Sequence, residues 1–300
     1  MGRLVQASSQ IANTNKFTLS GWFRIPTALL VSNTDMHLFS FGDGGDDHNL
    51  ENSEIRVRNV NNASDTLIEA YFSGPLFSDP EDNRYDIFGG NYDDAPMADT
   101  SGGSGNGFFY DQIAHRAALG SKIVKDQWYH LFVAADLSVA DSISFIPQSR
   151  VTRSRKIDIY LDRDRLVGQY RLAVGLSIFT AGVTAPLPAF NFLASGLSMA
   201  IPSPDYRVSL QNGVEYDDLQ VWFGTYVEPT SDNLDRFVKE VNGVGRKVSP
   251  SVAAEAFGEP TLLFKGGAEQ FKTNRGTGGT FTKVGTLTDF TPTASYEVIA

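Results

Sequence analysis

Alternation of apolar and polar residues predicts a protein built mainly from β-strands. In segment 17–23, Phe17, Leu19, Gly21 and Phe23 fall on one side of an extended chain, and Thr18, Ser20 and Trp22 fall on the other. This is the period of two typical of a strand. Segments 54–58 and 66–72 predict a hairpin joined by the polar residues 59–65. Further strands are predicted at 37–41, 126–136, 157–162, 165–170 after a turn at 163–164, 215–223 and 261–264.

Two segments near the C-terminus have the features of helices. Between an N-cap candidate, Ser231, and a helix-ending glycine, Gly243, apolar residues recur at i, i+3, i+4 and i+7, at Leu234, Phe237, Val238 and Val241. A second, shorter helix is predicted from Ser249 as N-cap, with Pro250 in its first turn, to Gly258.

Other segments show no clear period. Residues 73–112 are rich in Gly, Asp, Asn and Ser and predict a long loop, and 171–206 predict irregular strands and loops. We therefore expect three parts: a β-sandwich over 1–228, a helical segment over 229–258 and a Gly/Thr-rich extension over 259–300.

Composition narrows the classes of partner and site. A net charge of −10 disfavours nucleic acid, whose phosphates require a basic surface. The absence of cysteine excludes disulfides, thiolate metal sites and cysteine nucleophiles. No apolar segment approaches the roughly 20 residues needed to span a bilayer, and no apolar stretch follows Met1–Gln6 as in a signal peptide, so no membrane partner is expected.

Four sequence pieces occur in an order that resembles a known fold. They are Phe17-Thr-Leu-Ser-Gly-Trp22, Asp126-Gln-Trp-Tyr-His130, Ile157-Asp-Ile-Tyr-Leu-Asp162 and Tyr216-Asp-Asp-Leu-Gln-Val-Trp222. Over roughly 15–240 the chain is similar to laminin-G-like and concanavalin-A-like jelly rolls, which implies an all-β antiparallel sandwich. Arg163 departs from the pattern, because the family prefers glycine in that turn.

The tail has a resemblance of its own. Pro260-Thr-Leu-Leu-Phe-Lys-Gly266, Asn274-Arg-Gly-Thr-Gly-Gly-Thr-Phe-Thr282 and Gly285-Thr-Leu-Thr-Asp289 look like the C-terminal pattern of structural proteins of tailed bacteriophages. A glycine-rich backbone is costly to order, so the tail requires a ready surface. That surface is either the sandwich itself or a neighbouring subunit. The apolar anchors are Leu262, Leu263, Phe264, Phe271, Phe281, Val284, Leu287 and Phe290.

A catalytic site is not expected. Glycoside hydrolysis needs two carboxylates about 5–10 Å apart. Glu215-Tyr-Asp-Asp-Leu lacks the third acid of a Glu-x-Asp-x-Glu strand, and Asp158 and Asp162 share a face with Tyr160 but have no glutamate beside them. The pattern Gly-x-Ser-x-Gly of serine hydrolases is absent. We expect no hydrolytic activity and no cofactor.

Other polar and aromatic residues allow either a structural or a functional interpretation. The acidic segments 43–47 and 79–82 have ligand chemistry suited to calcium, but they favour polar turns because their spacing fits no recognised loop. Among His37, His48, His115 and His130, the last is expected to be packed and hydrogen-bonded. Trp22, Trp128 and Trp222 are expected in the core, whereas Phe108, Phe109 and Tyr110 are candidates for a partner surface.

These features together favour a non-enzymatic structural protein of a tailed-phage particle. The first expectation is an exterior capsid decoration or head-associated protein, located in the virion after assembly in the bacterial cytoplasm. Its expected partners are the major capsid protein, other virion proteins and further copies of itself. The alternative is a carbohydrate-binding adhesin of the tail or fibre, with a glycan as partner.

Overall fold

The fold is described here from a computed structural model of the whole chain. The residues described are 3–6, 11–12, 14–25, 34–42, 53–60, 65–73, 112–118, 127–136, 138, 141–144, 156–166, 169–173, 184–187, 198–201, 214–284, 287 and 298–299. Within this part of the chain no helix is long and apolar enough to cross a membrane.

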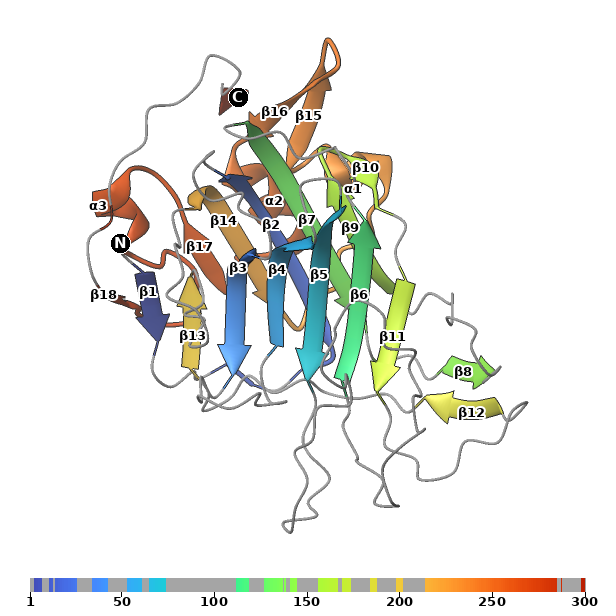
Figure 1. Cartoon of the computed structure of the whole chain (residues 1–300). Coiled ribbons are helices and arrows are strands. Elements are labelled where there is room, and N and C mark those ends of the chain that lie inside the picture. Colours follow the sequence, from blue (N-terminus) through green and yellow to red (C-terminus); the bar gives the residue numbers. More distant parts are fainter. Residues whose placement is uncertain are drawn as a thin grey trace.

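Two large sheets form the body of the molecule (Figure 1). The first has the strand order β11 (Gln169–Ala173), β6 (Gln112–Ala118), β5 (Asp65–Ser73), β4 (Ser53–Val60), β3 (Thr34–Gly42), β13 (Ser198–Ile201), β1 (Arg3–Gln6) and β18 (Thr282–Val284). The second has the order β10 (Asp164–Arg165), β9 (Lys156–Leu161), β7 (Trp128–Asp136), β2 (Lys16–Arg24), β14 (Glu215–Phe223) and β17 (Leu262–Phe264).

Smaller elements complete the described structure. β8 (Asp141–Ser144) pairs with β12 (Thr184–Leu187), and β15 (Val238–Val241), β16 (Val244–Val248) and β19 (Val298–Ile299) form a three-stranded sheet. All of these pairings are antiparallel except that of β16 with β19. The helices are α1 (Ser231–Leu234), α2 (Pro250–Phe257) and α3 (Ala268–Phe271). The expected all-β antiparallel jelly-roll class is therefore confirmed.

The main core fills the space between the two large sheets. Alternate residues of the six-stranded sheet point into it, and they meet inward-facing residues of β3, β4 and β5. The fully buried members include Phe17, Val133, Ile159, Val221, Phe264, Phe39, Val57 and Ile68. The period of two predicted for 17–23 places Phe17, Leu19 and Phe23 in this core, as expected.

The predicted helix over 231–243 is wrong beyond its first turn. α1 ends at Leu234, and the chain then forms the β15–β16 hairpin, which extends beyond the two sheets (Figure 1). Asn242 and Gly243 lie at the hairpin turn with φ of 55° and 75°, the conformation that Asn-Gly favours between two strands. Leu234, Phe237 and Val238 are buried, but Val241 is 40% exposed. The four residues at helical spacing therefore do not share one buried face. The cap is Thr230, whose Oγ1 accepts a bond from the N–H of Asn233, and not Ser231.

The hairpin turn after β9 also differs from its prediction. The turn lies at Asp162 and Arg163, which have φ of 48° and 73°, one residue before the expected position. β10 then contains only Asp164 and Arg165, and β11 belongs to the other sheet. Arg163 adopts the left-handed conformation that favours glycine, and it forms an ion pair with Asp235 and a hydrogen bond to the Ser231 hydroxyl. The predicted α2 helix from 250 to Gly258 is confirmed.

The Gly/Thr-rich tail folds onto the sandwich. β17 pairs with β14 as the last strand of the six-stranded sheet, and β18 pairs with β1 at the edge of the other sheet. Asn274 anchors the loop between them: its Oδ1 accepts bonds from the N–H groups of Leu263 and Gly276, and its Nδ2 donates to the carbonyl of Gly279. Of the two surfaces considered for the tail, the chain's own sandwich therefore holds residues 259–284.

Two glycines of the tail are required by close backbone approach. A Cβ on Gly276 would overlap the carbonyl oxygen of Pro260, and one on Gly278 would lie 2.8 Å from the carbonyl oxygen of Thr261. The N–H of Gly278 donates to that Thr261 carbonyl at 2.7 Å. The glycine-rich pattern of the tail is thus explained by its packing against the start of β17.

Candidate functional site

The outer face of the six-stranded sheet is covered by the segment 225–258, which we call the cover. Phe132, Ala134 and Trp222 point outward from the sheet and pack against Val227, Leu234, Phe237 and Ala253 of the cover. Trp22 and Trp128 pack against Val238 in the same layer. All nine residues of β7 are buried because both of its faces are covered. The expectation that the three tryptophans are core residues is confirmed.

The acidic motif at the start of β14 is engaged by basic side chains. Glu215 forms a two-bond ion pair with Arg24 on β2. Asp217 and Asp218 both contact Lys247 on β16, with Nζ–Oδ2 distances of 3.0 and 2.6 Å. A β-bulge lies between Asp217 and Gln220, and Asp218 has a φ of 45°. Because the bulge breaks the regular alternation of side chains, the two consecutive carboxylates both reach the ammonium group of Lys247.

Burial dominates the electrostatics of this cluster. It raises the pKa of Asp217, against the opposing effect of Lys247, and it lowers the pKa of Lys247, against the opposing effect of Asp217. Neither Asp217 nor Asp218 faces solvent as a hydrolytic carboxylate does. From the sequence, Glu215-Tyr-Asp-Asp-Leu was considered as a hydrolytic motif and set aside because it lacks the third acid. The partner Lys247 was not foreseen, because nothing in the linear pattern links it to β14.

His130 lies in the middle of β7 under the cover. Its Nε2 is 2.9 Å from the hydroxyl of Ser20, and its ring stacks with Phe237 at a centroid distance of 6.5 Å. In the described part of the chain its Nδ1 has no hydrogen-bond partner. Burial lowers the pKa of His130 to about 3, so the ring is neutral at physiological pH. The expectation that it is a packed, hydrogen-bonded residue is confirmed.

The neutral state of His130 predicts a loss of stability on acidification. The unfolded histidine takes up a proton near pH 6.5 and the folded one only near pH 3, so the free energy of unfolding falls as pH drops below 6.5. At pH 5 this loss is about 2 kcal/mol relative to pH 7. Denaturant titrations at both values should show that the stability difference between wild type and His130→Gln changes by that amount.

Asp162 supplies a control of opposite sign. Its Oδ1 accepts a bond from the N–H of His130, and burial raises its pKa to about 6. Between pH 6 and 3.8 the Asp162 carboxyl is therefore protonated in the folded state but ionised in the unfolded state. As a result it stabilises the folded state by about 1 kcal/mol more at pH 5 than at pH 7. Asp162→Asn should change the pH profile in the opposite direction to His130→Gln. Parallel profiles for all three proteins would contradict the two pKa shifts.

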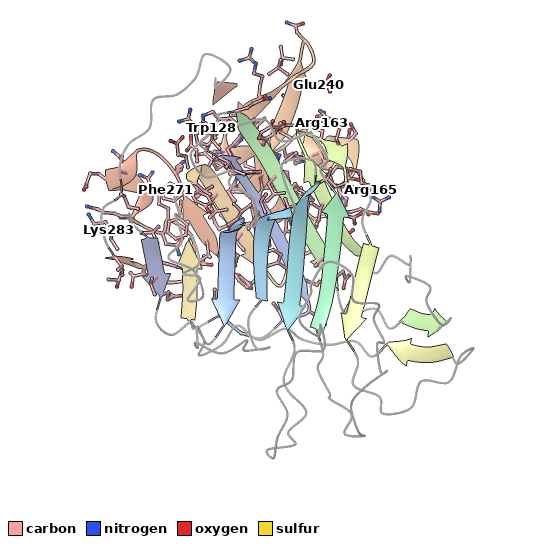
Figure 2. The ribbon with its side chains drawn as sticks, in the orientation of Figure 1. Trp128, Arg163, Arg165, Glu240, Phe271 and Lys283 are labelled. Carbon is pink, nitrogen blue, oxygen red and sulfur yellow. The ribbon has the colours of Figure 1, made fainter. Side chains whose placement is uncertain are left out.

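A group of aromatic and charged side chains lies on the outer face where the sheet reaches its edge. We call Asp158, Tyr160, Arg165 and Tyr226 the tyrosine patch. The Asp158 carboxylate accepts a bond from Arg165 Nη2 at 2.9 Å and one from the Tyr226 hydroxyl at 3.0 Å. Both tyrosines are partly buried against the apolar residues that pack between the sheet and the cover, and Tyr160 makes an edge contact with Phe132. The Arg165 side chain is 55% exposed on the edge strand β10 (Figure 2).

Burial and the neighbouring carboxylate keep both tyrosines protonated. Burial and then Asp158 raise the pKa of Tyr160 and of Tyr226 above the usual value near 10. Both hydroxyls therefore remain hydrogen-bond donors at physiological pH. The sequence placed Asp158 and Tyr160 on one face, but Tyr226 and Arg165 join them only through the three-dimensional fold.

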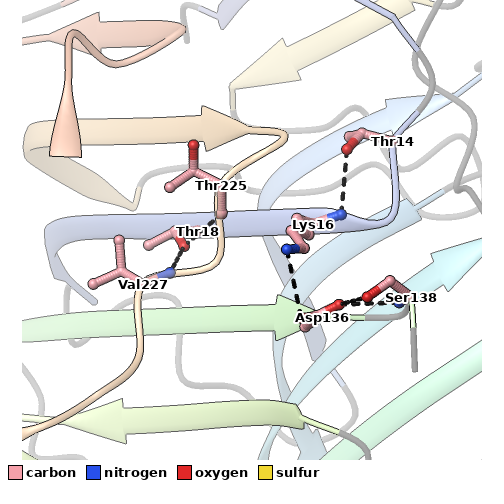
Figure 3. A network of polar contacts seen from close by, with 7 residues as sticks. All are labelled: Thr14, Lys16, Thr18, Asp136, Ser138, Thr225 and Val227. Atoms are coloured by element: carbon pink, nitrogen blue, oxygen red, sulfur yellow. Dashed lines mark hydrogen bonds and ion pairs between the residues drawn. The ribbon is translucent and has the colours of Figure 1, made fainter.

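Hydrogen bonds to β2 fix the backbone on both sides of Tyr226 (Figure 3). The Thr18 hydroxyl donates to the carbonyl of Thr225 at 2.9 Å and accepts the N–H of Val227 at 3.0 Å. At the nearby end of β7, Asp136 lies 3.9 Å from the ammonium of Lys16 and accepts bonds from Ser138. The segment that carries Tyr226, between β14 and α1, is thus tied to β2, while the other three patch residues lie on β9 and β10.

Several candidate residues from the sequence lie outside the described residues. These are the acidic segments 43–47 and 79–82, His48, and the aromatics Phe108, Phe109 and Tyr110. His37 and His115 lie on β3 and β6, where their side chains are not described. Among the described residues no group of three or more His, Asp or Glu could hold a metal ion.

Comparisons with known proteins give distant structural likenesses. No family model matches the sequence, and no curated protein matches it. A heptameric SAP-like pentraxin from Limulus polyphemus is 10% identical, with a TM-score of 0.36 over 76% of this chain and 72% of that chain. The enzymatically active domain of bacteriophage CBA120 tailspike protein 2 is 9% identical, with a TM-score of 0.35 over 75% of this chain and 24% of that chain.

A third structure is similar at the same distant level. Domain 4 of AbnA, a GH43 extracellular arabinanase from Geobacillus stearothermophilus in complex with arabinotriose, is 12% identical, with a TM-score of 0.24 over 65% of each chain. Likenesses of this size say nothing about what this chain binds.

Proposed function

We propose that the chain is a non-catalytic carbohydrate-binding protein of a tailed-phage particle. The observation that supports carbohydrate binding is the tyrosine patch: two partly exposed aromatic rings beside a hydrogen-bonded carboxylate and guanidinium at the edge of the six-stranded sheet. This proposal is the adhesin alternative considered from the sequence, and the tyrosine patch is the surface on which we expect the sugar to bind.

The chemistry of the patch suits a neutral sugar. Tyrosine rings offer apolar faces to the C–H groups of a pyranose, and their hydroxyls remain polar. Asp158 has acceptor positions beyond the two bonds that it already makes, and Arg165 has donors beyond its one bond to Asp158. Asp158, Glu228 and Asp136 raise the pKa of Tyr226 through their negative charge, and the exposed guanidinium of Arg165 brings a positive charge to the same patch. Charges of both signs meet there, which favours a neutral sugar over a charged one.

The ion pairs formed by the acidic side chains support a binding role without catalysis. Glu215, Asp217 and Asp158 each form an ion pair with a basic side chain, and hydrolysis would need an acid and a base or nucleophile free to exchange protons with a bound sugar. Incubation with neutral β-glucans is therefore expected to release no reducing sugar.

The phage assignment is supported by the resemblance of the tail to phage structural proteins. The exterior-capsid position that the sequence favoured first, with capsid protein and further copies as partners and the virion as location, stays a prediction from that resemblance. The tyrosine patch adds support to the adhesin alternative and none to the capsid position.

Glycan binding tests the proposal. Wild type should bind one or more neutral glycans on an array, and Tyr160→Ala should weaken that binding by about five- to twelvefold, since loss of a ring contact removes about 1–1.5 kcal/mol. Arg165→Ala should have a similar effect without changing the core. Isothermal titration with the best array ligand measures both changes.

Matched controls locate the effect. Lys272→Ala removes an exposed cation at the C-cap of α3, where Lys272 pairs with Glu269, and should leave affinity unchanged. Circular dichroism should show that all three variants are folded. Equal affinity of wild type and Tyr160→Ala would contradict the patch, as would complete loss of binding in EDTA, which would point to a metal site elsewhere.

A further inference from the structure

Three buried charged side chains from different parts of the chain meet under the cover. Asp217 and Asp218 come from β14, and Lys247 comes from β16, next to the start of α2. Their side chains are 7%, 5% and 10% exposed, and the Lys247 Nζ lies 3.0 and 2.6 Å from the two Oδ2 atoms. Two carboxylates against one ammonium leave this cluster with a net negative charge away from water.

We propose that Lys247 and Asp217 condense to form an intramolecular amide (isopeptide) bond, with Asp218 as the proton shuttle. The geometry supplies the three groups that such a reaction needs: an amine in contact with a carboxyl group, and a second carboxyl group in contact with the same amine. Holding reactants in contact replaces a bimolecular step by an intramolecular one, which greatly raises the effective concentration.

Burial removes the ordinary obstacle to this reaction. In water an ammonium and a carboxylate are both strongly solvated and do not condense, whereas a buried pair pays a large desolvation penalty for its charges. Burial lowers the pKa of Lys247 and raises that of Asp217, so both are shifted toward the neutral amine and carboxylic acid that react. The product amide is neutral and needs no such solvation.

Hydrogen bonds identify Asp217 as the carboxyl group that is attacked. Its Oδ1 accepts the N–H of Asp218 at 2.8 Å, and its carboxylate also accepts the N–H of Gly266 after β17. Backbone donors of this kind stabilise the negative oxygen of a tetrahedral intermediate. Asp218 lies 2.6 Å from Nζ, close enough for direct proton transfer.

The reaction balances without any added reagent. Asp218 takes one proton from the Nζ of the Lys247 ammonium and passes it to Oδ2 of Asp217, and the neutral amine then attacks Cγ of the Asp217 carboxylic acid. Asp218 carries a second proton from Nζ to Oδ2, and the Cγ–Oδ2 bond breaks as that oxygen leaves as water. A Cγ–Nζ bond has formed, Asp218 is a carboxylate again, and the net charge of the cluster is unchanged.

The bond would join the central sheet covalently to the base of the β15–β16 hairpin. It would close a loop from residue 217 to residue 247, which contains α1 and β15. A chain without cysteine has no disulfide to limit its unfolded state, and this cross-link would act in the same way.

The intact mass of the purified full-length protein under denaturing conditions tests the proposal. The expected mass is one water, about 18 Da, below that of the sequence, either at once or after prolonged incubation. Protease digestion should give a branched peptide in which Lys247 is linked to Asp217. A mass equal to that of the sequence, before and after incubation, would overturn the proposal.

Variants separate this bond from other losses of water. Lys247→Met and Asp217→Ala should each have the full sequence mass, whether or not they fold, whereas a succinimide at an aspartate would survive Lys247→Met. Asp218→Asn should form the bond more slowly than wild type. The exposed pair Lys272 and Glu269 should remain unlinked in every digest. A branch at Asp218 in place of Asp217 would overturn the assigned roles.

Discussion

Removal of residues 259–300 is expected to give a chain that aggregates or does not fold. The deletion takes away β17 and four buried side chains, Leu262, Leu263, Phe264 and Phe271. Each is worth about 1.5–3 kcal/mol of burial, so the total is comparable to the 5–15 kcal/mol that stabilises an ordinary domain. The edge of β14 would also lose its partner strand. Soluble yield, size-exclusion chromatography and thermal unfolding measure the outcome.

Point substitutions in the tail give a graded version of this test. Phe264→Ala should lower the free energy of unfolding by about 3–5 kcal/mol, because the ring is fully buried against Phe271 and Phe281. Val284→Ala, at a position that is 42% exposed, should change it by less than about 0.5 kcal/mol. A truncated chain that is monomeric and melts within a few degrees of wild type would contradict the structural role of the tail.

The second large effect is expected for Phe237→Ala in the cover. This ring contacts Phe132, Trp222 and Phe257 at centroid distances of 5.3, 5.8 and 5.7 Å, and it also stacks on His130. Its removal would leave a cavity beneath the cover and cost about 3–5 kcal/mol. For a chain of this size that corresponds to a fall in Tm of about 5–8 °C, measurable by calorimetry.

Two further variants show whether the cavity is the cause. Phe257→Ala removes a partly buried ring from the same cluster and should cost less, and Val241→Ala at the exposed hairpin tip should be nearly neutral. If Phe237→Ala and Val241→Ala melt at the same temperature, the cover does not pack on the sheet as described.

The strands were predictable where burial imposes a clear pattern. Phe17, Leu19 and Phe23 alternate with Thr18 and Ser20 because one side of β2 faces the core. The strand predicted over 215–223 follows from the same pattern, and it is β14. The short strands β6 and β18 were missed because neither 112–118 nor 282–284 has a distinctive apolar pattern.

The cover was predicted less well because local and long-range effects conflict there. The spacing of Leu234, Phe237 and Val238 fits a helix, but Asn242-Gly243 strongly favours a hairpin and the valines favour strands. Lys247 could not be assigned to Asp217 and Asp218, since only the bulge in β14 brings them together. For the same reason the tyrosine patch could not be assembled: Tyr226 reaches Asp158 across 68 residues.

Tyrosine ring signals in an NMR titration would show whether the tyrosine patch binds a sugar. The protein is labelled on its tyrosine rings, and the signals of Tyr160 and Tyr226 are assigned with the Tyr160→Phe and Tyr226→Phe variants. On addition of the best neutral glycan from the array, these two ring signals are expected to shift and saturate together, while Tyr216, partly buried against the main core, stays unchanged. Saturable shifts confined to other tyrosines, with Tyr160 and Tyr226 unaffected, would contradict it.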